Sequence, residues 1–183
     1  MQTPEFKIRP AVSADIARLV AFNHTCRSDY VWQLDLRKGE GEIKVGLREV
    51  RLPRPVKVQY PRDPVLLADE WKKNAKTFVA IAGGIQLGYI RVFEQESAGS
   101  VWVLDLVVET EARQKGVATA LIQKVERWAT ERGNRQLFIE MSSKNHPIIS
   151  LVKKMGFEFS GYNDHYYLTQ DVALFFGKLL KEF

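Results

Sequence analysis

Six consecutive residues, Arg113 to Ala118 (RQKGVA), have the composition of a turn that binds an anion. Its small residues would leave the first backbone N–H groups of a following helix unpaired and pointing outward, in the positive field of the helix dipole. Two cations, Arg113 and Lys115, lie in the same stretch. The turn therefore favours a negatively charged ligand, and a diphosphate above all.

Two regular elements would position this turn. The residues from about Ser100 to Glu109 form a near-continuous apolar run rich in Val and Leu, which predicts a buried strand. The residues from about Gly116 to Arg132 carry apolar side chains at helical spacing, and Gly133 is a C-terminal helix signal. The sequence thus predicts a strand, a tight turn and an amphipathic helix.

One acidic residue, Asp105, stands inside the otherwise apolar strand. An unpaired carboxylate is costly to bury, so its presence suggests a chemical role. Structural explanations remain open, because Asp105 could pair with a basic neighbour or lie at a sheet edge. Glu109 and Glu140 are the other carboxylates considered for the same role.

The strand, turn and helix together resemble the acetyl-CoA signature of the GNAT N-acetyltransferases. In that signature a strand is followed by Arg or Gln, two residues, Gly, one residue, and Gly or Ala, and here these positions hold Arg113, Gly116 and Ala118. A second match is Asn145, which precedes a short expected helix ending at Gly156-Phe157.

The C-terminal part extends this resemblance. Residues 157–162 and 166–168 are expected to form two short strands, and the residues from Asp171 to Leu180 a closing helix. That helix resembles the tail of streptothricin-type acetyltransferases. The combined resemblance covers roughly residues 76 to 183.

The resemblance implies an α/β fold with a GNAT-like sheet of six or seven strands, mixed and mostly antiparallel, flanked by helices. The two central strands would splay apart to admit the pantetheine arm of acetyl-CoA, the expected co-substrate. The whole chain, residues 1–183, is expected to form a single domain, since 183 residues with 45% hydrophobic content can bury a full core.

The expected contacts with acetyl-CoA follow from the same resemblance. Backbone groups of the splayed strand would supply an oxyanion donor and bind pantetheine as an added strand would. The turn amides would hold the diphosphate, and Asn145 begins the helix beside the CoA arm. The contact residues are Leu106, Val107, Val108, Arg113, Gln114, Lys115, Gly116, Val117, Ala118, Thr119 and Asn145.

By the same resemblance, Asp105 would bind the amine or serve as base, directly or through water. The general acid is a departure from the family. Many members carry a Tyr four residues before the closing Gly-Phe of the second helix, where this chain has Val152. Tyr162 is our candidate for a replacement acid, although a thiolate leaving group does not strictly need one at neutral pH. Other candidates, besides solvent, are Tyr166, Tyr167, His146, His165 and Ser150.

The N-terminal third matches the family only loosely. Residues 25–36 are expected to form a second helix or a partly ordered loop over the acceptor pocket. Gly41 to Tyr60 is expected to form a β-hairpin arm of two strands joined at Leu52–Pro55, with basic side chains exposed. That arm is either a solvated hairpin or a surface for an acidic partner or a second subunit, so a homodimer is one expectation.

The amino-acid composition limits the kinds of partner that we expect, such as nucleic acid, metal ions and membranes. Lys and Arg number 27 against 22 Asp and Glu, a net charge of +5, but the charges are dispersed and nucleic-acid binding is not expected. One cysteine, Cys26, and three histidines offer no zinc-ligand spacing, so no metal is predicted. No membrane span is recognised, and the single cysteine fits a reducing, cytoplasmic setting.

The leading hypothesis is an acetyl-CoA-dependent N-acetyltransferase that moves the acetyl group to a primary amine of a small molecule by direct attack. Direct attack is expected because no activated nucleophile is evident in the sequence. Two alternatives stay open. One is a protein or peptide N-acetyltransferase, and the other is a non-catalytic module that binds acyl-CoA.

Overall fold

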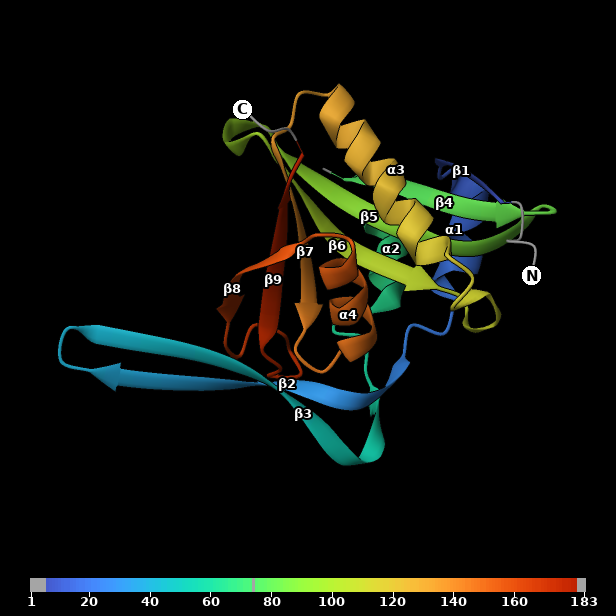
Figure 1. The fold of residues 1–183 in the computed structure, drawn as a ribbon. Coiled ribbons are helices and arrows are strands. Elements are labelled where there is room, and N and C mark those ends of the chain that lie inside the picture. Colours follow the sequence, from blue (N-terminus) through green and yellow to red (C-terminus); the bar gives the residue numbers. More distant parts are fainter. Residues whose placement is uncertain (1–5, 74, 181–183) are drawn as a thin grey trace.

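The computed structural model describes residues 6–73 and 75–180, and its largest element is a seven-stranded sheet (Figure 1). The strand order is β1-β4-β5-β6-β7-β9-β8, and among these described strands only β6 and β7 pair in parallel. The mixed, mostly antiparallel α/β fold is therefore confirmed. The strands of this sheet are β1 (Lys7–Pro10), β4 (Lys76–Ala82), β5 (Ile85–Gln95), β6 (Ser100–Val108), β7 (Gln136–Ser142), β8 (Glu158–Asn163) and β9 (Ala173–Leu179).

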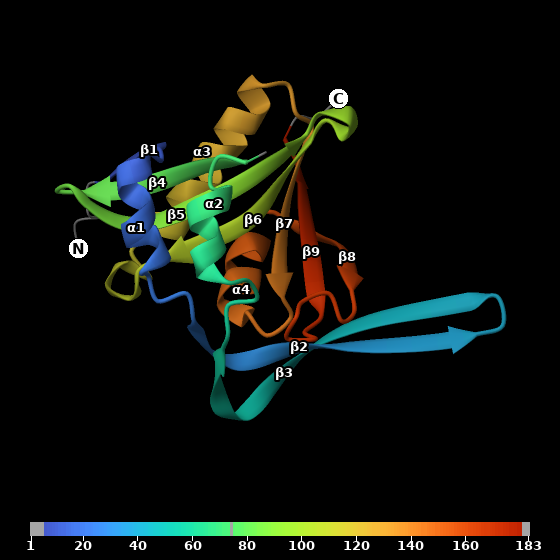
Figure 2. The ribbon, with the colours of Figure 1, turned by 180° about the vertical axis from the view of Figure 1, so that it is seen from behind.

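Helices cover both faces of the sheet. The helices α3 (Val117–Glu131) and α4 (His146–Lys154) lie on the face seen in Figure 1. The helices α1 (Ser13–Val20) and α2 (Leu67–Glu70) lie on the opposite face, seen in Figure 2. Each face has its own buried apolar cluster, which closes the core on both sides of the sheet.

The strand and helix on either side of residues 113–118, the predicted anion-binding turn, form as predicted. The strand β6 runs from Ser100 to Val108 and α3 from Val117 to Glu131, each within one residue of its expected ends. Gly133 takes a positive φ of 84° just after the helix, a conformation that glycine adopts without strain.

The central strands β6 and β7 separate part of the way along. They pair only where Ser100–Val103 lies beside Gln136–Ile139, although both strands continue further. The predicted splayed pair is therefore confirmed. Beyond Val103, the edge of β6 that faces β7 has no strand partner, and the two strands form a fork.

A β-bulge at Leu104 accompanies the fork. On β5, Arg91 pairs with Asp105 and Val92 pairs with Val103, so Leu104 is an extra residue on β6. An extra residue reverses which face the following side chains occupy. Val103 accordingly packs in the α3/α4 cluster, whereas Val107 packs in the α1/α2 cluster. The bulge therefore places Asp105 on the α1/α2 face.

The prediction of a closing helix over Asp171–Leu180 is wrong. These residues form β9, which pairs with β7 on one side and β8 on the other. A short apolar run does not by itself distinguish a buried strand from a helix, and here pairing on both edges decides the outcome. Likewise β8 forms as expected, but residues 166–168 lie in the loop between β8 and β9 and not in a strand.

The prediction for residues 25–60 is also wrong, because the strand that pairs with residues 42–58 is residues 26–39 and not part of the same segment. Residues 25–36 are neither helix nor loop, because β2 (Cys26–Gly39) pairs along its length with β3 (Glu42–Val58). The hairpin turn lies between these strands at Glu40-Gly41. Leu52–Pro55 falls in the irregular stretch opposite Asp29, where Pro residues do not disrupt the ladder. We call this two-stranded hairpin, residues 26–58, the arm; it extends away from the sheet (Figures 1 and 2).

No described helix is long and apolar enough to cross a membrane.

Candidate functional site

A cleft of about 540 Å³ lies at the fork between β6 and β7. It is lined by residues 103–108 of β6, by most of the turn before α3, and by residues 139–142 of β7. The start of α4 and the residues at the two ends of the arm complete its walls. The cleft thus joins the predicted anion-binding turn to the unpaired edge of β6.

Two residues of the turn before α3 have an unusual backbone conformation. Gln114 and Gly116 both take left-handed conformations, with φ of 60° and 82°. Gly116 is the N-cap of α3, and no side chain of the residues that the structure describes caps the first amides of that helix. The first N–H groups of a helix have no partner within the helix, so these uncapped amides are free to bind an anion.

The two cations of the turn have different surroundings. Arg113 lines the cleft, but its guanidinium donates to the carbonyl oxygens of Val108 (3.0 Å) and Asn23 (2.7 Å). Arg113 therefore braces the turn against the end of β6 and adds positive charge to the cleft. Lys115 is exposed and is not among the residues that line it.

The other predicted contacts with acetyl-CoA lie together. Leu106, Val107 and Val108 line the cleft along β6, and Gln114 and Gly116–Thr119 line it at the turn. Asn145 caps α4: its Oδ1 accepts from the backbone N–H of Ile148 (3.5 Å) and from the thiol of Cys26 (3.4 Å).

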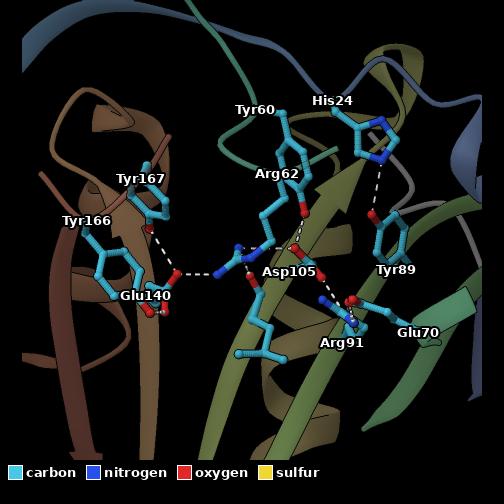
Figure 3. Close-up of polar contacts among 11 residues, drawn as sticks. His24, Tyr60, Arg62, Glu70, Tyr89, Arg91, Asp105, Glu140, Tyr166 and Tyr167 are labelled. Carbon is cyan, nitrogen blue, oxygen red and sulfur yellow. Dashed lines mark hydrogen bonds and ion pairs between the residues drawn. The ribbon is translucent and has the colours of Figure 1, made fainter. Parts of the chain in front are cut away.

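Asp105 is buried, and both of its carboxylate oxygens accept hydrogen bonds. Its Oδ2 accepts from Arg91 Nε at 2.5 Å, and its Oδ1 accepts from the Tyr60 hydroxyl and lies 3.4 Å from Arg62 Nη1 (Figure 3). The structure therefore shows the explanation in which Asp105 pairs with a basic neighbour. Two cations compensate the cost of burying this carboxylate.

Arg62 bridges the two diverging strands of the fork, β6 and β7 (Figure 3). Its Nη1 donates to the carbonyl oxygen of Leu104 (2.7 Å), the bulged residue of β6, and its Nη2 pairs with Glu140 on β7. Burial alone would lower the pKa of Arg62, but the carboxylates of Asp105 and Glu140 outweigh this effect and raise it. Arg62 is thus a permanent cation that ties the diverging strands together.

Glu140 and two tyrosines complete the cluster. The hydroxyl of Tyr166 donates to Glu140 Oε2 (3.0 Å) and that of Tyr167 to Oε1 (3.2 Å). Burial, with the nearby carboxylate of Glu140, raises the pKa of both tyrosines. Both hydroxyls therefore stay protonated and act as donors at neutral pH.

His24 lines the cleft beside this cluster. Its Nδ1 lies 2.7 Å from the carbonyl oxygen of Phe22, and its Nε2 lies 3.1 Å from the hydroxyl of Tyr89. Because Nδ1 must donate to the carbonyl, Nε2 accepts from Tyr89 in the neutral ring. Burial lowers the pKa of His24, which keeps the ring neutral at pH 7.

The candidate acid Tyr162 is not among the residues that line the cleft. It lies on β8 opposite Leu174 of β9 and packs against the core. Val152, at the position of the usual family tyrosine, is completely buried. Among the alternative tyrosines, Tyr167 is the one that lines the cleft.

Sequence reasoning missed Tyr60 and Arg62. Tyr60 was placed at the end of the expected Gly41–Tyr60 hairpin, and Arg62 lies just beyond it. Their position near Asp105 depends on long-range folding. The one available signal was Asp105 itself, whose burial calls for a cationic partner. Among the described residues no group of three or more His, Cys, Asp or Glu could hold a metal ion.

The comparisons identify the class of protein. The model of the acetyltransferase (GNAT) family matches residues 46–157, more than half of the chain, and the chain belongs to this family. It is therefore an N-acetyltransferase with acetyl-CoA as co-substrate. The uncapped helix start and the unpaired edge of β6 fit the diphosphate and pantetheine of that molecule.

Individual acetyltransferases within the family are also similar to this chain. A streptothricin acetyltransferase of Streptomyces lavendulae is 26% identical over 88% of this chain and 86% of its own length. An aminoglycoside N(6′)-acetyltransferase of Salmonella typhimurium is 33% identical over 52% of this chain and 68% of its own. The crystal structure of nourseothricin acetyltransferase is similar with a TM-score of 0.81 and 25% identity, covering 96% of this chain and 99% of that one.

Proposed function

We propose that this enzyme transfers the acetyl group of acetyl-CoA to a primary amine of a small cationic molecule. The main observation is the buried cluster of Asp105, Glu140 and Arg62 at the fork, on the α1/α2 face of the sheet. The streptothricin and aminoglycoside acetyltransferases among the relatives are named for small-molecule acceptors, which supports the same class here.

The cluster retains capacity to bind an ammonium group. Asp105 Oδ2 accepts from Arg91 alone and Glu140 Oε2 from Tyr166 alone among the described residues. A carboxylate oxygen can accept two hydrogen bonds, so each has one lone pair left for the acceptor amine or for a water beside it. We assign Asp105 the role of holding the amine and, through water, receiving its proton.

The remaining chemistry is direct attack. The deprotonated amine attacks the thioester carbonyl, the new C–N bond forms, and the C–S bond breaks with the thiolate leaving. A backbone N–H on the unpaired edge of β6, between Leu104 and Val108, would stabilise the negative charge on the carbonyl oxygen. Tyr167 lines the cleft, so it replaces Tyr162 as our candidate to protonate the thiolate. Its hydroxyl donates to Glu140 Oε1 in this structure and would have to turn to the sulfur for that step.

Release of free CoA thiol across a panel of acceptors tests this proposal. The panel contains a streptothricin, an aminoglycoside, peptides with free N-termini, lysine peptides and a blank without amine. We expect thiol release with the small cationic amines and intersecting lines in two-substrate kinetics, as for a sequential mechanism. Release with peptides alone would favour protein acetylation instead, and CoA binding without any thiol release would indicate a non-catalytic module.

A further inference from the structure

Two cations face each other at the base of the arm. Arg27 on β2 is directly paired in register with Lys57 on β3. Within residues 6–73 and 75–180, neither side chain takes part in an ion pair or a side-chain hydrogen bond. Like charges directly opposite one another destabilise a strand pair. The pairing of Arg27 with Lys57 therefore has an energetic cost that the fold itself does not explain.

The same arm shows how such a pair is usually neutralised. Arg37 and Lys44 are also directly opposed, nearer the tip. Arg37 pairs with Asp35 at 3.1 Å, and Lys44 pairs with Glu42 at 3.1 Å. The arm thus supplies a carboxylate to each cation of the outer pair but to neither cation of the inner pair. The inner pair has positive charge available for a ligand.

The inner pair lines a groove that continues the cleft. Eight of the described residues line this groove of about 470 Å³. They include the cations Arg27, Lys57 and Arg113, and none of the eight is a carboxylate. Thr25, Cys26, Arg27 and Arg113 line both the groove and the cleft at the fork. The groove therefore opens from the cleft on the side of the anion-binding turn, where Arg113 lies.

We propose that Arg27 and Lys57 bind the 3′-phosphate of the ADP portion of acetyl-CoA. The inference rests on the use of acetyl-CoA by this enzyme. With the diphosphate at the uncapped start of α3, the adenosine and its 3′-phosphate are the next part of the molecule along the chain of bonds. A phosphate monoester carries about −1.5 to −2 charges at neutral pH, which two unpaired cations match.

The test compares CoA with 3′-dephospho-CoA, which differs only in this phosphate. Affinities are measured by titration calorimetry for the parent and for the double variant Arg27→Gln/Lys57→Gln. We expect the parent to bind CoA at least tenfold more tightly than dephospho-CoA, a difference of about 1.4 kcal/mol. The double variant should bind CoA about tenfold more weakly and dephospho-CoA as the parent does.

A matched control removes the same two charges elsewhere on the arm. The variant Arg37→Gln/Lys44→Gln should keep the affinities of the parent for both ligands. The double variant at the base should also unfold at the same or a higher temperature without ligand, because it relieves a repulsion. That result separates lost binding from lost folding.

Other outcomes would overturn the assignment. An equal loss of affinity for CoA and dephospho-CoA would mean that the pair acts on the diphosphate or through general attraction. Unchanged affinity for both would place the 3′-phosphate elsewhere. If the parent bound neither ligand, the use of acetyl-CoA would be in error, a failure distinct from the other two.

Discussion

At the scale of single residues, Asp105 illustrates what a sequence can show. A lone acid in an apolar strand indicated a site, but not its partners. Tyr60 and Arg62 come from a connection between the arm and α2, and Glu140 comes from another strand. Only the bulge at Leu104 and the fork beyond Val103 bring them onto one face. These are tertiary features without a local signal.

The first prediction concerns Asp105→Asn. The amide would leave the buried guanidinium of Arg91 with the partly exposed carboxylate of Glu70 (3.0 Å) as its one remaining ion-pair partner among the described residues. Removing one partner of a buried ion pair costs about 3–5 kcal/mol, and we take this range as the upper bound here. We expect a loss within that bound in urea unfolding. We also expect kcat/KM for the amine to fall at least about hundredfold, since the amine loses its anionic anchor.

The double variant Asp105→Asn/Arg91→Gln separates the two effects. Without the under-compensated guanidinium of Arg91, most of the free energy of unfolding should return, because its remaining partner Glu70 is partly exposed and can be solvated. Activity should stay low if Asp105 contacts the amine, because no carboxylate is restored. Recovery of activity together with stability would show that Asp105 only supports the fold.

At the scale of elements, the start of α3 was the most predictable part of the chain. Its signals are local: a glycine at the N-cap, apolar residues at helical spacing and a glycine after the last turn. The strand β9 was the least predictable, because its apolar residues fit either a helix or a strand. Residues 41–60 were recognised as strand-forming, but β2, which pairs with β3, was expected to be a helix or a loop.

The second prediction concerns Gly116. A Cβ there would meet no atom within 4 Å, but the φ of 82° strains most side chains. Asp and Asn tolerate this conformation better than most residues and differ by one charge. Acetyl-CoA at a hundredfold excess over Kd should stabilise the parent by about 2.7 kcal/mol. We expect Gly116→Asn to keep most of this stabilisation and Gly116→Asp to lose it in thermal unfolding.

If both variants lost the stabilisation by acetyl-CoA, the cause would be a changed backbone conformation at residue 116 and not the added negative charge. Retention in both would place the diphosphate away from the start of α3.

The third prediction uses Gly177 to distinguish a strand from a helix at the C-terminus. A Cβ on Gly177 in β9 would lie 2.6 Å from Ser160 Oγ and 2.7 Å from Phe138 Cε1. Gly177→Ala should therefore destabilise the protein by about 1–3 kcal/mol through overpacking. In a helix the same change would stabilise by up to about 1 kcal/mol, so the sign of the effect in urea unfolding decides.

At the scale of the whole molecule, Asp15 joins the N-terminal segment to the sheet. Its carboxylate accepts from Arg9 on β1 (2.7 and 3.0 Å), from Gln86 on β5 (2.9 Å) and from the backbone N–H of Val12 (2.8 Å). The hydrogen bond with Arg9 is the largest cause that lowers the pKa of Asp15, from 3.8 to about 2, against the opposing effect of burial. One buried carboxylate thus links three parts of the chain.

The fourth prediction is the acid dependence of this link. Because the pKa of Asp15 is lower in the folded than in the unfolded chain, its hydrogen bonds stabilise the fold above about pH 4. That contribution, about 2 kcal/mol, is lost as the pH falls from about 4 to about 2. Asp15→Asn should therefore lower the free energy of unfolding by about 2 kcal/mol at pH 7, measured with urea. Near pH 2 the variant and the parent should differ little.

The control for this prediction is Asp35→Asn on the arm. Its carboxylate pairs with Arg37, both side chains are more than half exposed, and such surface pairs contribute about 0–1 kcal/mol. This variant should match the parent closely at both pH values. An undiminished loss at pH 2 in Asp15→Asn would show that Asp15 stabilises the fold through packing. In that case its charge would not be what holds α1 to β1 and β5.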